Sequence, residues 1–364
     1  MTPWLRVWTR AVVGPAWRRA MALWVGSAIV GAVVFGPTGM QPRDLTGLAL
    51  HVPGVAAVLG LTWLLLFVPT ARLLVRAEAA AFLRSLPGPR TAPRVITVLA
   101  LVGLQLPWLV LWLLGEHALG LAIVAGWTLV IGLVAVMRLR PVAHRAPVWS
   151  SSLTALVGIY RRALGRRASD ALVRGAGLAV LAGLVGGLMI RNNAATGGHA
   201  AVLATAGIAI VLVPGWAGVL LPLVEAQRST TWPALSLGIS AARRSLALAV
   251  VIAAVYVASA VIAIAAAAIT ASCDIATLAE LVAVSLATVV AAALVATRAV
   301  IHADRQAADA PRDITARSPA AARVVVGAVT GSALGVIAIA WLGPVGAIGA
   351  VALGTAAVAS ARPA

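Results

Sequence analysis

The chain of 364 residues contains no lysine, because all 28 of its basic Lys and Arg residues are arginine. A phosphate-binding P-loop uses a lysine to reach the β- and γ-phosphates, and Schiff-base catalysis uses a lysine amine. Neither device can be encoded here. Chemistry driven by a nucleotide would therefore need a nucleotide site in another subunit.

Sulfur and imidazole ligands are equally scarce. Cys273 is the single cysteine, which excludes an internal disulfide, a CxxC redox pair and a thiolate zinc cage. The five histidines are scattered, and no Asp or Glu lies at metal-ligand spacing from them. The passes described below also hold almost no acid, base or activated nucleophile. We therefore expect no catalytic residue, no metal and no cofactor.

Charge is sparse and apolar residues dominate. Charged residues make up 10% of the chain and hydrophobic residues 62%, against about 25% and about 45 to 50% in soluble domains. Such a chain cannot cover itself with polar surface, so the lipid bilayer is its expected solvent. The net charge of +18 does not predict nucleic-acid binding, because the arginines flank apolar segments, where they contact anionic headgroups.

The arginines are sorted by side. The apolar stretches predict ten passes, and when the connections are numbered alternately, 26 of the 28 arginines fall in one set. Only Arg43 and Arg191 fall in the other, while the ten acidic residues split six to four. Short loops biased in this way lie in the cytoplasm. We therefore expect a multi-pass protein of the bacterial inner membrane with both termini inside.

The fold class expected is an all-α polytopic bundle of about ten transmembrane helices. The passes are predicted at residues 20–35, 46–68, 95–114, 119–137, 172–190, 200–224, 246–270, 276–297, 324–342 and 345–360. A span needs about 20 apolar residues, so the first and last are the shortest candidates.

Chain order predicts six segments. They are an N-terminal interfacial helix (1–19), a four-pass unit (20–137) with an inner helix at 71–86, a basic connection (138–171), a second four-pass unit (172–298), a cytoplasmic linker (299–323) and a C-terminal two-pass hairpin (324–364). Each unit has an even number of passes, so we interpret the two as parallel repeats about an axis normal to the membrane.

Three cytoplasmic segments have one apolar and one basic face. Trp4, Leu5, Trp8, Ala11 and Val12 share a face of the first, which Gly14 and Pro15 are expected to end. Residues 71–86 and 153–164 show similar stripes opposite arginines. This pattern predicts helices that lie in the membrane interface.

One acidic residue lies clearly within a pass. Glu280 is about one turn from the predicted outer end of its helix, and Arg191 at the outer end of another pass is the cation expected to neutralise it. An intramembrane carboxylate is a functional hypothesis by default. Because Glu280 is shallow, a structural or snorkelling role is the stronger interpretation.

The inner segment after the second pass resembles a known family. The string Arg76, Ala77, Glu78, then Phe82 to Pro87, together with an N-terminal interfacial helix, is similar to the membrane subunits of type-two ATP-binding-cassette exporters. The resemblance implies a non-enzymatic permease whose inner helix docks a separate cytoplasmic ATPase, which would move a hydrophobic or lipid-like substrate. It also implies dimerisation with itself or with another permease. The docking residues implied are Arg72, Arg76, Glu78, Phe82, Arg84 and Pro87, with a second set at Glu225, Arg228, Arg243 and Arg244.

Three other interpretations stay open. The inner segment fits equally well as a helix held to headgroups by its arginines. The whole chain fits a membrane scaffold, because glycines in two passes allow close helix approach: Gly177, Gly183, Gly186 and Gly187 in the fifth, and Gly327, Gly331 and Gly335 in the ninth. A lipid-modifying membrane enzyme is the third, and the missing acid and base residues count against it.

Overall fold

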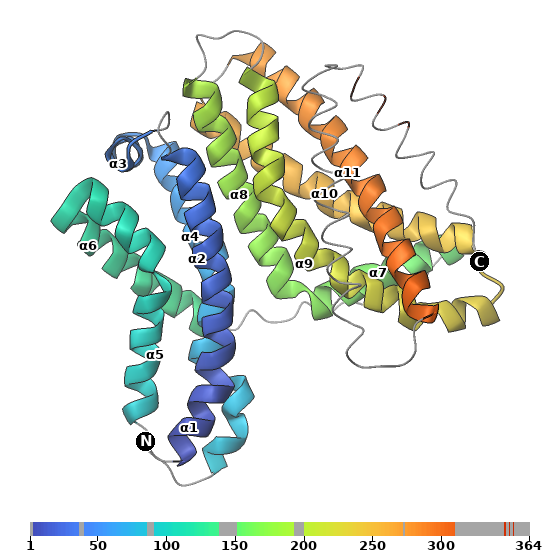
Figure 1. Ribbon diagram of the computed structural model, residues 1–364, viewed down its shortest axis with the longest axis horizontal. Helices are drawn as coiled ribbons and strands as arrows, with labels where there is room; N and C mark the ends of the chain where they lie inside the picture. The colour runs from blue at the N-terminus through green and yellow to red at the C-terminus, as the bar shows by residue number, and fades with distance from the viewer. Residues whose placement is uncertain are drawn as a thin grey trace. The chain divides into compact units, whose positions relative to one another are not determined.

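A computed structural model describes residues 3–35, 40–85, 91–137, 151–192, 200–271 and 274–309, with the single positions 346, 349 and 352. Every regular element in these ranges is a helix (Figure 1), which confirms the expected all-α fold for this part of the chain. The chain divides into two compact units, Met1–Ala143 and His144–Ala364. Each unit is described by itself.

The elements follow in chain order. In the first unit they are α1 (Pro3–Trp8), the π-helix η1 (Thr9–Val13), α2 (Gly14–Val34), α3 (Pro42–His51), α4 (Pro53–Arg76), the 3-10 helix η2 (Glu78–Ser85), α5 (Thr91–Leu104) and α6 (Leu106–Val136). In the second they are α7 (Ser152–Arg167), α8 (Ser169–Asn192), α9 (Ala200–Ser236), α10 (Ala241–Ala271) and α11 (Ile275–Asp309).

Five helical stretches are long and apolar enough to cross a bilayer. By length and composition they are Pro53–Leu83, Leu106–Val136, Ser169–Asn192, Ala241–Ala271 and Ile275–Ile301. The first of these is broken at Ala77 and the second folds back at His117, as described below. This set of helices is that of a multi-pass membrane protein. Ten passes stay a prediction, and the ninth and tenth lie outside the described residues apart from the three single positions.

The N-terminal helix does not end where the sequence predicts. Backbone angles stay helical through Val13 and Gly14, and α1, η1 and α2 follow one another without a gap. In η1 the amide of Gly14 donates to the carbonyl of Thr9, five residues back. Pro15 has no N–H, and its ring would clash with the carbonyl four residues earlier in an ordinary helix. The wider π turn accommodates the proline, so Gly14 and Pro15 do not act as a stop.

The second predicted pass is divided. Val52 is extended, with φ −115° and ψ 103°. The ring of Pro53 disfavours helical backbone angles at the residue before it. The pass therefore begins at Pro53, and residues 42–51 form the separate helix α3. At the other end, Ala77 adopts a left-handed conformation with φ 46° and stops α4. The inner helix expected over 71–86 is thus the end of α4 followed by η2.

The third and fourth passes meet at a sharp reversal. His117 leaves helical geometry with φ 45° and ψ −113°, within the turn predicted at 115–118. A Cβ on Gly120 would collide with the backbone carbonyl of Trp112, although residues eight apart in a straight helix are separated by about 12 Å. The third pass is also interrupted at Gln105, two residues before Pro107, which the sequence analysis did not predict.

The second unit is a packed set of four long helices with α7 beside them. Helix α8 packs against both α9 and α10, and α11 packs against the same two helices. Glycines set the distance between α8 and α10, since a Cβ on Gly187 would lie 2.8 Å from the carbonyl oxygen of Ala267. These four helices correspond to predicted passes five to eight, and α9 and α11 continue beyond the predicted ends at 224 and 297.

Candidate functional site

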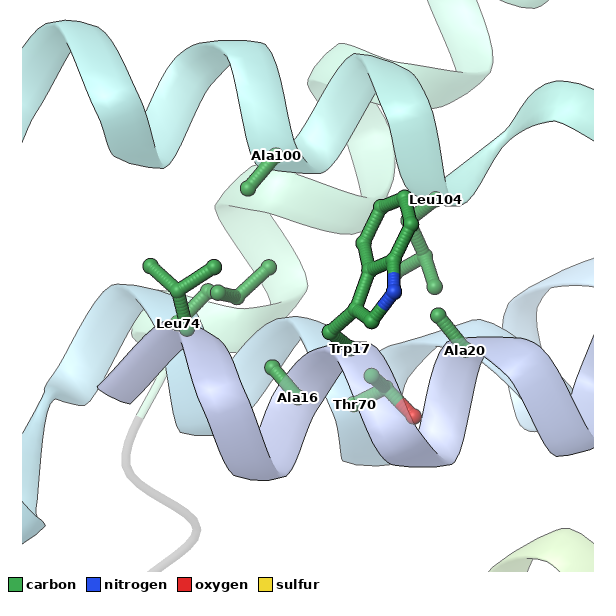
Figure 2. A pocket seen from close by; sticks show the side chains of 8 residues that line it. Ala16, Trp17, Ala20, Thr70, Leu74, Ala100 and Leu104 are labelled. Atoms are coloured by element: carbon green, nitrogen blue, oxygen red, sulfur yellow. The ribbon is translucent and has the colours of Figure 1, made fainter. Parts of the chain in front are cut away.

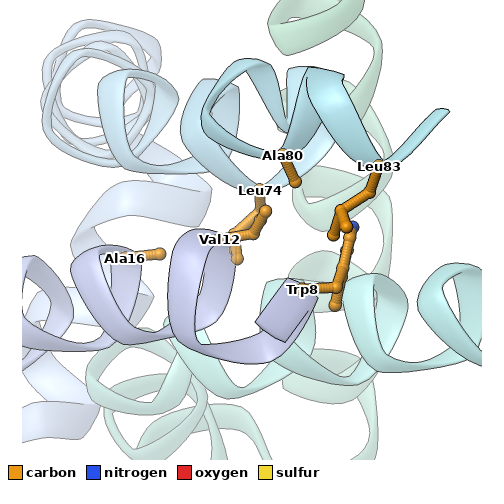
Figure 3. Close-up of a cluster of buried hydrophobic side chains, with 6 residues drawn as sticks. All are labelled: Trp8, Val12, Ala16, Leu74, Ala80 and Leu83. Atoms are coloured by element: carbon orange, nitrogen blue, oxygen red, sulfur yellow. The ribbon is translucent and has the colours of Figure 1, made fainter. Parts of the chain in front are cut away.

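The predicted docking segment in the first unit is held by the N-terminal helix. Trp8 and Val12 pack against Ala80 and Leu83 of η2, with Trp8 5% and Leu83 4% exposed (Figure 3). The indole Nε1 of Trp4 also donates to the carbonyl of Leu83 at 3.4 Å. The apolar face predicted to lie in lipid is therefore buried within the protein instead.

η2 consists of two short helical turns that meet at Ala80, where the backbone leaves helical geometry with φ −110° and ψ 17°. The exposure of each side chain, rather than a regular spacing, separates the buried row from the exposed positions. Ala80 and Leu83 form the buried row, whereas Glu78 and Ala79 are exposed, and Phe82 is 59% exposed. A carboxylate and an aromatic ring of η2 are thus exposed, while Ala80 and Leu83 pack on the N-terminal helix.

The two arginines of α4 are not presented in the same way. Arg76 donates from Nε to the carbonyl of Ala135 at 3.3 Å and from Nη2 to that of Met137 at 2.8 Å. It therefore satisfies the last carbonyls of α6, a common use of a cation at a helix C-terminus. Arg72 is half-buried, and its Nε has no hydrogen-bond partner among the described residues. The side chain of Arg84 and all of Pro87 lie outside the described part.

A small cavity lies further along the same helices. It is lined by α2, α4 and α5, with Trp17, Thr70 and Leu104 among its walls (Figure 2). Its volume is about 10 Å³, the space for about one water molecule. The Thr70 hydroxyl is buried without a hydrogen-bond partner in the described part of the chain. The cavity is too small to hold an organic substrate as it stands.

The second predicted docking set lies where α7 meets α9 and α10. Tyr160 of α7 donates its hydroxyl to the Gln227 Oε1 atom, and Leu156 and Leu164 are buried on the same side of α7. The expected interfacial helix thus packs on the protein here as well. Its outward side carries exposed arginines, including Arg161 and Arg166.

Two charged residues of that second set make polar contacts within the unit, and a third is buried. Glu225 forms an exposed ion pair with Arg167 at 3.4 Å. Arg243 donates to the hydroxyl of Ser152 at 3.4 Å, and Arg244 is only 8% exposed. The fourth, Arg228, is exposed and also has an interaction within the chain. The sequence-level resemblance therefore grouped residues that have different surroundings.

The predicted outer pair of Arg191 and Glu280 stays a prediction. Both residues are exposed. Nearby, a hydrogen bond with the Thr277 side chain holds the pKa of the Asp274 carboxyl below its usual value, with further hydrogen bonds to backbone groups acting in the same direction. These contacts place Asp274 at the start of α11, where a carboxylate stabilises the first turn. Cys273 lies outside the described residues.

The described residues contain no group of three or more His, Cys, Asp or Glu that could hold a metal ion. No protein-family model, curated protein or solved structure matches this chain. Among the described residues, the geometric feature that bears most directly on function is η2 with its N-terminal support. Sequence reasoning identified the apolar stripe at Trp4 to Val12 but assigned it to lipid, because a stripe alone does not say what covers it.

Proposed function

We propose that this chain is the membrane permease subunit of an ATP-driven exporter, and that a separate cytoplasmic ATPase docks on the exposed side of η2. One observation carries the proposal. A short segment between two apolar helices is held by a buried cluster at Ala80 and Leu83, while Glu78 and Phe82 of the same segment are exposed. The arginine distribution predicts that this connection lies in the cytoplasm.

Rigid support makes η2 suitable for passing on a partner's movement. The packed residues Trp8, Val12 and Leu83 leave η2 little freedom to move independently, and close-packed interiors transmit strain because they are hard to compress. Since η2 joins α4 to α5, a partner that displaces it also displaces those two helices. A flexible loop at this position would absorb the same movement.

The interior favours an apolar or lipid-like substrate. Buried polar residues of the described part are mostly Thr, Ser and Gln, and its one buried charged residue, Arg244, lies close to the start of α10. Ion-coupled carriers use ionisable groups near the midplane of the membrane. A transporter driven by a separate cytoplasmic ATPase does not need such ionisable groups.

The scaffold alternative loses part of its sequence argument. Three of the glycines that would allow a partner helix to approach already face other helices of the second unit. Added Cβ atoms on Gly183 and Gly187 would meet α10, and one on Gly186 would meet Ile208 of α9. These surfaces are occupied by the chain's own helices. We therefore favour the permease.

The test places a photo-crosslinking amino acid at Phe82 of the full chain in its native host. We expect capture of a protein that contains a P-loop ATPase domain, identified by mass spectrometry. The matched control carries the crosslinker at Leu99 of α5, which is 65% exposed and is expected to face lipid.

A double variant adds a second readout. Glu78→Ala combined with Phe82→Ala should abolish co-purification of that ATPase, whereas Arg94→Ala, which changes an exposed residue of α5, should leave it intact. Capture of no ATPase at Phe82, or unchanged co-purification of the double variant, would show the docking proposal to be wrong.

A further inference from the structure

Large apolar side chains are exposed where α9 ends. Trp232 is 77% exposed, Leu235 58% and Leu237 75%. Together with Arg228 they form what we call the α9-end patch. Residues 228, 232 and 235 follow the spacing of one helix face, so the patch is a continuous stripe that ends at Leu237.

The opposite face of the same segment is buried. Ala226, Gln227 and Ala234 are 2%, 5% and 3% exposed, and Gln227 accepts the hydrogen bond from Tyr160 of α7. The end of α9 is thus fixed to the second unit by one side only. Apolar stripes that remain exposed on an ordered helix usually mark a contact surface.

Two features favour lipid as the occupant. Helix α10 is a candidate membrane span that begins at Ala241, four residues after Leu237, so the headgroup layer is the surface nearest to the patch. In Figure 1 the yellow end of α9 also turns away from the direction of its first half. Pro222 lies within α9, and prolines are a common cause of such bends.

Charge then selects the class of lipid. Arg243 and the α7 residues Arg161 and Arg166 are exposed in the same unit, whereas the nearest acidic residue, Glu225, is paired with Arg167. Basic residues beside a membrane attract anionic headgroups, and tryptophan is enriched at this depth.

We infer that the α9-end patch binds anionic phospholipid of the cytoplasmic leaflet. Trp232, Leu235 and Leu237 insert among the headgroups, and Arg228 and Arg243 contact the phosphates. Contact with the membrane interface, which the sequence predicts for other helices, is thus made by the end of α9. The sequence pattern had placed this segment in the second predicted docking site. This inference is independent of the proposed ATPase.

The test measures lipid contact directly. Leu237→Cys is made in a Cys273→Ser background, labelled with bimane, and reconstituted as the full chain in phosphatidylcholine nanodiscs. Quenching by doxyl-labelled phosphatidylglycerol and by doxyl-labelled phosphatidylcholine gives the relative association of the two lipids. We expect strong quenching, with a preference for phosphatidylglycerol that falls about fivefold for each arginine replaced in Arg228→Gln and Arg243→Gln.

Controls separate the patch from general lipid contact. Ser236→Ala, on the same turn of α9, should keep the preference, whereas Trp232→Ser with Leu235→Ser should weaken quenching at residue 237. If neither lipid quenches the bimane at residue 237, the inference is wrong. If the ATPase then shields that bimane from solvent, the patch is a protein-docking surface instead. Equal quenching by both lipids would overturn the assignment to anionic lipid.

Discussion

At the scale of single residues, glycine sets the closest contacts between helices in the second unit. A Cβ on Gly183 would collide with the backbone carbonyl of Ala263 and the side chain of Ala266. The carbonyl belongs to α10 and cannot move aside as a flexible side chain would. In a bilayer, where apolar burial alone does not drive helices together, such close approach supplies much of the packing energy.

Gly183→Ala should therefore destabilise the second unit by about 1 to 3 kcal/mol, the usual cost of overpacking. Gly175→Ala is the matched control, because it lies on the same helix and nothing lies within 4 Å of its added Cβ. Since alanine is the better helix former by about 1 kcal/mol, the control should be neutral or stabilising. Denaturation in mixed detergent micelles measures both. Equal midpoints for the two variants would contradict the close contact.

At the scale of elements, the N-terminal helix supports η2 through one large side chain. Trp8 is 5% exposed in the cluster with Leu83, whereas Trp17, nine residues further along, is 50% exposed. The two tryptophans share a continuous helix but have different surroundings. Comparing them separates internal packing from lipid contact.

Trp8→Ala should cost about 3 kcal/mol, as expected for a buried large residue, and should increase amide exchange in η2. Trp17→Ala should leave exchange in η2 unchanged. Hydrogen exchange followed by mass spectrometry of peptides that cover residues 78–85 provides the measurement. Equal exchange in both variants would show that the N-terminal helix does not hold η2.

The apolar runs predict most of the helices but not their breaks. Passes five to eight follow from long stretches without charge, and α8 to α11 occupy them. The interruptions at Val52, Ala77 and Gln105 depend on single backbone conformations. Pro53 and Pro107 are sequence signals for the interruptions at Val52 and Gln105. No sequence signal marks the third interruption, because alanine rarely adopts the left-handed conformation found at Ala77.

What covers an apolar face was the harder question. The stripes at Trp4 to Val12 and at Leu156 to Leu164 read as lipid-facing, yet both pack on protein. Lipid tails and buried side chains are equally apolar, so a stripe alone cannot separate them. The structure answers the question, because the first stripe packs on η2 and the second packs on α9. The exposed patch at the end of α9 was missed for the same reason.

At the scale of the whole molecule, the distribution of arginine predicts which ends of the helices face the cytoplasm. With 26 of the 28 arginines in one set of connections, the connection between α10 and α11 is expected outside and that between α9 and α10 inside. Both proposals depend on this orientation, since an ATPase and the cytoplasmic leaflet are reached only from within.

Cys273 offers a direct check, because it is the only cysteine and follows the last residue of α10 by two positions. We expect it to react in intact cells with a maleimide that does not cross membranes. A Cys273→Ser, Ser240→Cys variant moves the thiol to the exposed turn before α10, and it should react only after the membrane is made permeable. If the labelling pattern is reversed, with Cys273 accessible only from the cytoplasm, the connections have the opposite orientation. The exposed sides of η2 and the α9 end would then face away from any ATPase, and the permease proposal would be wrong along with the topology.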